Sequence, residues 1–156
     1  QQAIEEWKKE PTPFVVFLDA DGSYSFDAVI DVISELNKGA DAVSGSRFLL
    51  PEGRPEGMSR IHNFGNKVLS SISSIRNRRK ISDLCTGLWG FNSKAIHGIE
   101  IESQGFDLEA ELAGKMRRRG FVHKEIAVKW SQRKGGKSKL RSIRDGFIIL
   151  LRILRT

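Results

Sequence analysis

The chain has 156 residues, the length of one ordinary domain, with 39% hydrophobic residues, 29% charged residues and a mean hydropathy of −0.32. This composition excludes a multi-span membrane protein and a disordered chain, and it allows one sizeable core. The 26 Lys and Arg residues exceed the 19 Asp and Glu residues by seven, which favours an anionic partner such as phosphate, nucleic acid or an acidic membrane. The single cysteine, Cys85, cannot form an internal disulfide, so we expect a reducing compartment.

Apolar periodicity predicts strands and helices that alternate along the chain. The predicted elements are a strand at residues 14–18, a helix from 26 to 39, a strand at 41–46, a helix at 61–75, an extended segment at 84–91, a helix at 106–119 and a strand at 122–130. Residues 14–18 are apolar throughout, which is typical of a buried parallel strand. This order favours an α/β sheet, in which ligands gather at the carboxyl ends of the strands.

The two ends of the sequence also carry predictions. Residues 141–156 are predicted to form an apolar helix edged by arginines, which would either lie on a membrane or pack on the domain. No apolar run approaches the roughly 20 residues that span a bilayer. The first residues are polar, resemble the tail of a helix rather than a signal peptide, and do not begin with Met. We therefore expect the sequence to start partway through a domain.

The charges lie in alternating blocks. Residues 1–46 and 81–114 carry net charges of −6 and −5, whereas residues 47–80 and 115–144 carry +6 and +11. A nucleic-acid-binding module usually has one broad basic face instead. The alternation therefore favours a site in which carboxylates and cations meet on one ligand, such as a metal-bound diphosphate.

Two carboxylates, Asp19 and Asp21, follow directly on the predicted strand at residues 14–18. Residues i and i+2 of an extended chain point to the same side, so both carboxylates should lie where such sheets bind ligands. Hard oxygen donors at this spacing suit Mg²⁺ or Mn²⁺, with phosphate oxygens completing the coordination shell. The alternative is an acidic turn that ends at Gly22.

A basic loop at residues 133–139 contains two adjacent glycines. Gly136-Lys137-Ser138 looks like the end of a P-loop, but Ser131 stands where that motif needs its first glycine. The P-loop interpretation is therefore rejected. The loop is predicted either to close over an anion or to be an ordinary solvated surface loop.

Six short motifs occur in order over roughly residues 1–145: Asp19-Ala20-Asp21-Gly22 after the first strand, Gly45-Ser46-Arg47, Ser59-Arg60, the segment 82–87, the segment 105–111, and Arg133-x-x-Gly136-x-Ser138-Lys139. Together they resemble family 2 glycosyltransferases of the GT-A fold, and in particular the dolichyl- and polyprenyl-phosphate sugar transferases. The resemblance implies an α/β GT-A (Rossmann-like) fold, with a mixed, mostly parallel sheet flanked by helices and incomplete at the amino terminus. Residues 1–140 would be the carboxyl-terminal two-thirds of the catalytic domain, and residues 141–156 an amphipathic, membrane-proximal helix.

Two departures from the family pattern bear on specificity. The strand and loop that hold the nucleotide base and ribose would precede Gln1. Ser23 stands where mannosyltransferases of this type often carry Gln, which weakens the assignment of mannose. The sequence therefore names neither the sugar nor the base.

The resemblance implies metal-dependent, inverting transfer of a sugar from a GDP- or UDP-linked donor to a polyprenyl phosphate, by a protein at the cytosolic face of a membrane. A divalent ion at Asp19 and Asp21 would stabilise the charge on the departing nucleotide. The residues implied are Asp19, Ala20, Asp21, Ser23, Arg47, Arg133 and Lys139 for the donor, Arg60, Lys137 and Ser138 for the acceptor phosphate, and Asp107 and Glu109 as catalytic carboxylates. Asp107 and Glu109 would orient the acceptor, or act as a base if the acceptor were a hydroxyl. The alternative is that they only stabilise the amino terminus of a helix through their negative charge.

Two other functions stay open. One is a family 2 transferase that acts on a saccharide hydroxyl in cell-envelope polysaccharide synthesis. The other is a non-catalytic module that binds anions or nucleic acid, supported only by the net charge of +7. The bases of residues 133–144 have little aromatic interleaving, so we expect no nucleic-acid partner.

Overall fold

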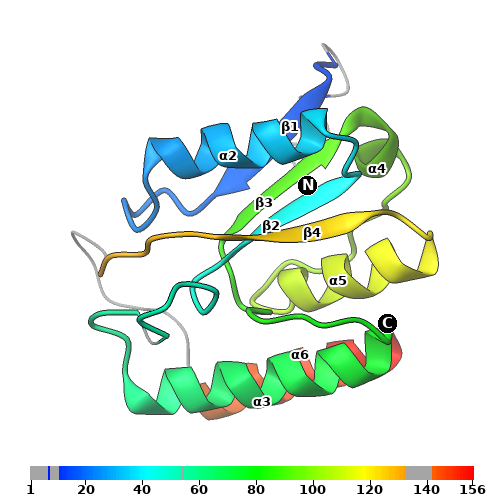
Figure 1. The fold of residues 1–156 in the computed structure, drawn as a ribbon. Coiled ribbons are helices and arrows are strands. Elements are labelled where there is room, and N and C mark those ends of the chain that lie inside the picture. The colour runs from blue at the N-terminus through cyan, green and yellow to red at the C-terminus, as the bar shows by residue number, and fades with distance from the viewer. Residues whose placement is uncertain (1–6, 8–10, 54, 133–141) are drawn as a thin grey trace.

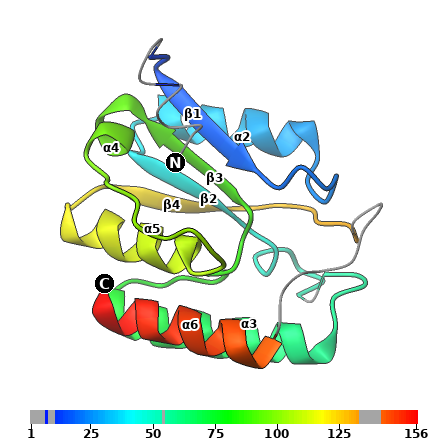
Figure 2. The same cartoon turned by 180° about the vertical axis from the view of Figure 1, so that it is seen from behind.

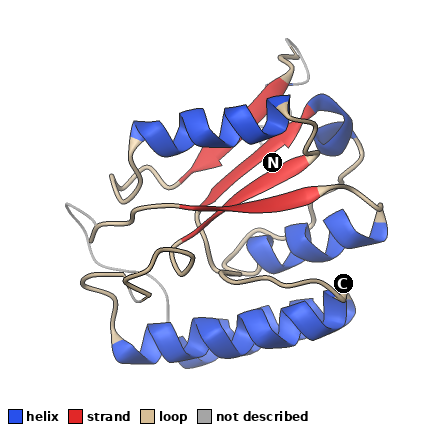
Figure 3. Cartoon of the chain, in the orientation of Figure 1, coloured by secondary structure: helices blue, strands red, loops and turns tan. Residues whose placement is uncertain are grey.

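The computed structural model describes residues 7, 11–53, 55–132 and 142–156, in which helices cover both faces of a four-stranded sheet (Figures 1 and 3). The order of the strands across the sheet is β1 (Phe14–Leu18), β3 (Leu88–Asn92), β2 (Ala42–Ser46) and β4 (His123–Ala127). The helices are α2 (Phe26–Asn37), α3 (Arg60–Asn77), α4 (Ser93–His97), α5 (Leu108–Arg118) and α6 (Ser142–Arg155). The predicted α/β class is confirmed.

The sheet is mixed. β3 pairs antiparallel with both β1 and β2, whereas β2 and β4 are parallel. Three strands therefore run in one direction, and β3 is inserted between β1 and β2 in the opposite direction. The prediction of a buried parallel strand at residues 14–18 was wrong in this respect, because β1 is only partly buried and its partner in the described sheet is the antiparallel β3. Because β1, β2 and β4 share one direction, their carboxyl ends lie at the same edge as the amino end of β3. The segments that follow or precede these ends bring Asp19, Arg47 and Gly87 to that edge.

The predicted elements are found with shifted boundaries. In the extended segment predicted at residues 84–91, only the part from Leu88 onward is a strand. The short helix α4 was not predicted, and it begins where the Asn92 side chain accepts a hydrogen bond from the backbone of Ala95 at 2.8 Å. α5 ends, as predicted, before Gly120, which has a positive φ of 67°.

Each face of the sheet has its own core. On one face α2 packs so closely on β3 that a Cβ added to Gly90 would collide with Val32. On the other face the core includes Phe91, Met116 and Ile153, from β3, α5 and α6. α3 and α6 lie side by side as the outermost layer of that face (Figures 1 and 2). α6 is therefore packed on the domain, and none of the described helices is long and apolar enough to cross a membrane.

The inner face of α3 is polar. Asn66, Ser70, Ser73 and Asn77 are buried on it, although apolar residues recur at helical spacing in the same helix. Residues 78–87 return beneath α3 without forming a strand, so their backbone N–H groups need acceptors. Ser70 Oγ accepts from Leu84 N at 2.9 Å, and Asn66 Oδ1 accepts from Cys85 N at 3.1 Å. Asn66 and Ser70 thus satisfy the returning segment. Ile61, Phe64, Val68 and Ile75 of α3 are exposed, whereas Leu69 and Ile72 pack against the core.

We expect His123 to make the protein less stable in weak acid. The ring is buried in β4, with Nε2 2.8 Å from Ser44 Oγ and its plane stacked on Trp89. Burial lowers the pKa of His123 to about 3. In the unfolded chain the histidine binds a proton near pH 6.5, whereas in the folded protein it stays neutral. The contribution of His123 to the free energy of unfolding should therefore decrease as the pH falls from about 6.5 toward 3, by up to about 1.4 kcal/mol per pH unit.

Urea unfolding of the parent, His123→Gln and His97→Gln between pH 4.5 and 7.5 tests this expectation. The His123 variant should lack this part of the pH dependence, whereas the variant of the exposed His97 should keep it. The explanation fails if the His123 variant retains the parent's slope.

Candidate active site

The two predicted metal ligands lie in the turn after β1. The backbone N–H of Asp19 donates to the Gly87 carbonyl at 3.0 Å, and the Asp19 carboxylate lies so close above Gly87 that an added Cβ would collide with it. One carboxylate oxygen of Asp21 accepts from the Ser23 backbone N–H at 3.0 Å and from the Ser23 hydroxyl. Ala20 is exposed between them. The turn therefore holds both carboxylates at the edge of the sheet where the carboxyl ends of β1, β2 and β4 lie.

Arg47, which follows β2, is held by a buried carboxylate. Its Nε lies 2.6 Å from Asp83 Oδ2, and its Nη2 lies 2.7 Å from Asp83 Oδ1 and 2.6 Å from the Cys85 carbonyl. Burial would lower the pKa of Arg47, but the hydrogen bonds and charge of Asp83 raise it above its ordinary value. The guanidinium is thus a fixed cation beside the turn.

Asp83 is the residue that sequence reasoning did not assign. It also accepts from the Arg47 backbone and, at 2.7 Å, from Asn66 Nδ2. Glu125 on β4 accepts from the backbone N–H groups of both Ser82 and Asp83. Asp83 lay within the quoted motif at residues 82–87, but its partners are far away in the sequence, and only the fold brings them together.

Asp107 and Glu109, near the amino terminus of α5, have different surroundings. Asp107 accepts from Ser103 Oγ at 2.5 Å and from Arg152 Nε at 2.7 Å, so it links α5 to α6. Burial alone would raise the pKa of Asp107, but these two hydrogen bonds hold it below its ordinary value. Burial raises the pKa of Glu109 to about 7, and the negative charges of Asp19 and Asp107 add to the shift. Of the two carboxyl groups, Glu109 is therefore the one whose pKa the charge of Asp19 raises.

The predicted acceptor residues lie partly outside the described structure. Arg60 is the first residue of α3 and is exposed, and Ser59 caps this helix by accepting from the His62 backbone N–H at 3.2 Å. Lys137 and Ser138, which were also predicted to bind the acceptor phosphate, lie outside the described residues, as do Arg133 and Lys139, which were predicted to bind the donor.

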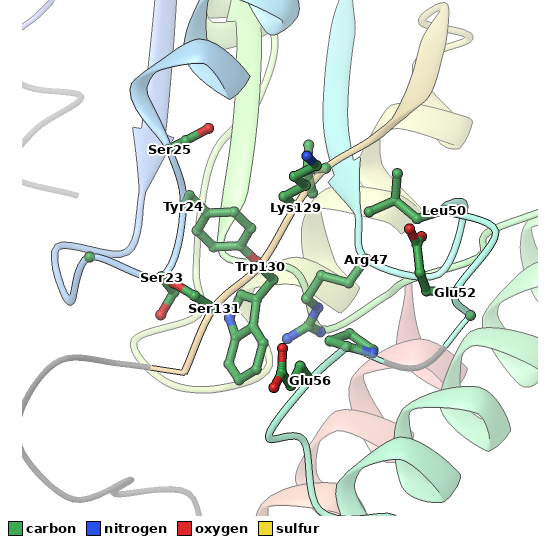
Figure 4. A pocket seen from close by; sticks show the side chains of 14 residues that line it. Ser23, Tyr24, Ser25, Arg47, Leu50, Glu52, Glu56, Lys129, Trp130 and Ser131 are labelled. Atoms are coloured by element: carbon green, nitrogen blue, oxygen red, sulfur yellow. The ribbon is translucent and has the colours of Figure 1, made fainter.

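Two cavities adjoin at Arg47. The first, of about 620 Å³, lies between the segment after Asp21 and the loop after β2, and Ser23, Glu56 and Lys129 are among its lining residues (Figure 4). The second, of about 550 Å³, has a mainly apolar lining from α3 and α6, including Leu69 and Ile149. Arg47 and Trp130 line both cavities. Asp19 and Asp21 line neither, so they lie beside the first cavity rather than within it.

The part of the chain described by the structure contains no cluster of three or more His, Cys, Asp and Glu side chains that could hold a metal ion. The metal assignment therefore rests on the two carboxylates of the turn, Asp19 and Asp21.

Comparison with known sequences identifies the family. Residues 1–99 match the model of "Glycosyl transferase family 2", and the chain therefore belongs to this family and has its GT-A fold. It is 29% identical over 157 residues to the glycosyltransferase AglJ of Haloferax volcanii, covering 99% of this chain and 51% of that protein. It is 29% identical over 141 residues to the uncharacterized glycosyltransferase Mb0553 of Mycobacterium bovis, covering 90% of this chain and 62% of that one.

A more distant similarity is to the polyprenol monophosphomannose synthase of Mycolicibacterium smegmatis, which is 25% identical over 133 residues, 81% of this chain and 48% of that protein. The chain thus spans between about half and three-fifths of the length of these relatives. The family resemblance inferred from the six motifs is confirmed at the level of family 2.

Proposed function

We propose that this chain is the catalytic part of a metal-dependent, inverting glycosyltransferase. It would move a sugar from a GDP- or UDP-linked donor to a polyprenyl phosphate at the cytosolic face of a membrane. The observation that carries the proposal is the pair of adjoining cavities that share Arg47 and Trp130. The first is bordered by the cations Arg47 and Lys129 and by hydroxyl side chains, which can bind phosphate oxygens, together with the carboxylates of Glu52 and Glu56. The second has Arg47 as the one Lys, Arg, Asp or Glu residue in its described lining, and its apolar residues from α3 and α6 suit a polyprenyl chain. The relative named as a polyprenol monophosphomannose synthase supports the same acceptor class.

On the donor side, the guanidinium of Arg47 is already held in a fixed orientation in which it could bind a phosphate. Its contacts with Asp83 and the Cys85 carbonyl use the Nε and Nη2 hydrogens, and the two hydrogens of Nη1 are the ones we assign to the diphosphate. Because Asp83 fixes the guanidinium beforehand, little ordering is required when the donor binds.

A divalent cation fits the donor set in the turn. Asp19 and Asp21 are carboxylates at one end of β1, and Mg²⁺ and Mn²⁺ prefer oxygen ligands. The missing side chain at Gly87 leaves the space that the Asp19 carboxylate occupies. When bound, the ion would stabilise the negative charge that develops on the departing nucleotide diphosphate.

On the acceptor side, a polyprenyl phosphate is already ionised near neutral pH, so its attack needs no strong general base. Arg60 is exposed at the start of α3, and we assign it to the acceptor phosphate. Glu109 would orient the acceptor in this reaction, and it would be the base if the acceptor were instead a saccharide hydroxyl.

A transfer assay with a cavity-filling variant tests the acceptor. Gly65 lines the apolar cavity, and an added Cβ would meet nothing within 4 Å, so Gly65→Leu should narrow the cavity without disturbing α3. We expect labelled GDP- or UDP-sugar to yield an organic-extractable polyprenyl phosphate sugar. Gly65→Leu should raise the KM for polyprenyl phosphate roughly tenfold, the effect of losing about 1.4 kcal/mol of binding, and leave the donor KM unchanged.

Ser71→Leu is the matched control, because Ser71 is exposed on the same helix and outside the cavity. It should leave both KM values unchanged. Transfer of sugar to a soluble saccharide but not to polyprenyl phosphate would refute the proposed acceptor, as would an effect of Gly65→Leu on the donor KM alone.

A further inference from the structure

Trp130 lies where the two cavities adjoin. Among the described residues, only Trp130 and Arg47 line both cavities. Figure 4 shows the side chain of Trp130 on the segment after β4, at the border of the first cavity. The side chain is half-buried, so part of the indole packs on the domain and part of it is accessible to a ligand. The guanidinium of Arg47 suits a phosphate, whereas the uncharged ring of Trp130 suits a different part of the ligand.

The backbone around Trp130 is tied to the segment after β1. Trp130 forms an isolated antiparallel bridge with Tyr24. The backbone N–H of Ser131 donates to the Ser23 carbonyl at 3.1 Å. The Tyr24 hydroxyl accepts from the Gly87 backbone N–H at 3.1 Å, and the Tyr24 ring belongs to the buried core on which Trp130 packs. The Trp130 side chain therefore starts from a fixed place relative to the turn after β1, before any ligand binds.

Two carboxylates in the first cavity indicate that its ligand carries hydroxyl groups. Glu52 and Glu56 line this cavity, and both residues are exposed. A carboxylate repels a phosphate, whereas it accepts hydrogen bonds from hydroxyl groups. The loop of Glu56 adjoins the segment after β4, because a Cβ added to Gly57 would meet the Gln132 side chain at 3.3 Å. The part of the cavity near Trp130 therefore combines an aromatic face with acceptors for hydroxyl groups.

This combination suits a pyranose ring. A pyranose has a face of C–H groups, which carry a small positive charge, and hydroxyl groups around its rim. The face of an indole is weakly negative, so it attracts these C–H groups and also shields them from water. A nucleotide base stacks on aromatic rings as well, but the ribose and two phosphates separate the base from the reacting carbon. At the boundary with the acceptor cavity, Trp130 would therefore meet the sugar end of the donor.

We propose that Trp130 forms the subsite for the transferred sugar, in which a hexopyranose stacks on the indole while Glu56 accepts hydrogen bonds from its hydroxyl groups. The inference rests on the proposed function, because it places the sugar between the donor phosphates at Arg47 and the acceptor in the second cavity. It adds a residue that recognises the sugar rather than the phosphates. After transfer, the nucleoside diphosphate lacks this contact, which favours its release.

Calorimetric titration of the active protein in Mn²⁺ tests this subsite. The ligands are GDP-mannose and UDP-glucose, each compared with its own nucleoside diphosphate. Trp130→Leu keeps an apolar side chain for packing but removes the aromatic face, whereas Trp130→Phe keeps both. Lys129→Ala is the matched control, because Lys129 lines the first cavity but not the second and can contact phosphate.

We expect Trp130→Leu to bind the nucleotide sugar that the parent prefers about five- to tenfold more weakly than the parent does, the effect of losing one aromatic contact. It should bind the nucleoside diphosphate as tightly as the parent. Trp130→Phe should resemble the parent with both ligands, and Lys129→Ala should lose affinity for both equally. Tryptophan emission of the parent should change further when nucleotide sugar replaces nucleoside diphosphate. Trp130→Phe should lack this sugar-dependent change, a result that does not require the Leu variant to fold.

Several results would overturn the sugar subsite alone. An equal loss of affinity for nucleotide sugar and nucleoside diphosphate in Trp130→Leu would place the ring against the nucleotide. A higher KM for polyprenyl phosphate with unchanged donor affinity would assign the ring to the acceptor. The subsite is also excluded if Trp130→Phe retains the sugar-dependent change in emission. Failure of the parent to bind either nucleoside diphosphate would instead contradict the proposed function.

Discussion

Asp21→Asn should lower the rate of sugar transfer by about two to three orders of magnitude, the size of effect expected when one group that stabilises transition-state charge is lost. The amide keeps the shape of the side chain but not its charge, and so weakens a carboxylate site for Mg²⁺ or Mn²⁺. Its oxygen can still accept from the Ser23 backbone N–H, as Asp21 Oδ1 does at 3.0 Å, so the turn and the fold should persist.

The measurement is kcat and donor KM for the active protein at several Mn²⁺ concentrations, with Asp31→Asn as the control. Asp31 is exposed on α2, and its variant loses the same charge away from the turn. The control should keep full activity, and a chelator should reduce the parent toward the level of Asp21→Asn. Turnover of Asp21→Asn within a few-fold of the parent at low Mn²⁺ would refute the metal assignment.

Asp83→Ala should reduce the free energy of unfolding by about 3 kcal/mol, the low end of the range for a buried pair, because it leaves the mostly buried Arg47 guanidinium, 11% exposed, without its counter-charge. The Asp83 carboxylate is fully buried, and it accepts from Arg47 through both the side chain and the backbone, as well as from Asn66. Few single positions in the described structure combine this burial with so many charged or polar partners.

Urea unfolding of Asp83→Ala, compared with the exposed Asp31→Ala, measures this loss. Replacing both members of the pair, with Arg47→Met and Asp83→Leu together, should recover part of the stability, because no uncompensated charge remains buried. A loss below about 1 kcal/mol for Asp83→Ala would mean that the pair is far less important to the fold than its geometry indicates.

Most elements of the fold could be predicted from local patterns. The apolar run at residues 14–18 and the helical spacing near residues 26–36 identify β1 and α2 without any long-range information. The inward face of α3 could not be predicted in this way. Its Asn66 and Ser70 are buried because residues 81–85 return beneath the helix. The sequence of α3 alone does not reveal that this segment packs against it.

In the candidate site, too, some residues could be predicted from the local sequence and others could not. The positions of Asp19, Asp21 and Arg47 could be predicted because they lie within three residues of the carboxyl ends of β1 and β2, which meet at the same edge of the sheet. Asp107 and Glu109 are two positions apart near the start of a helix, where such neighbours do not face the same side, so they meet different partners. The role of Asp83 depends on Arg47, 36 positions earlier, and only the tertiary structure joins them.

The insertion of β3 between β1 and β2 sets the order in which this domain can assemble. Leu18 pairs with Leu88, 70 positions later, and β1 and β2 each hydrogen-bond to β3. A growing polypeptide therefore holds two complete strands whose shared partner has not yet been synthesised. Closing so long a loop is entropically unfavourable and slows folding. During translation the edges of β1 and β2 that face β3 therefore lack this partner until residue 92 has left the ribosome, and the other edge of β2 waits for β4 until residue 127 has followed. Unpaired strand edges of this kind favour misfolding and aggregation.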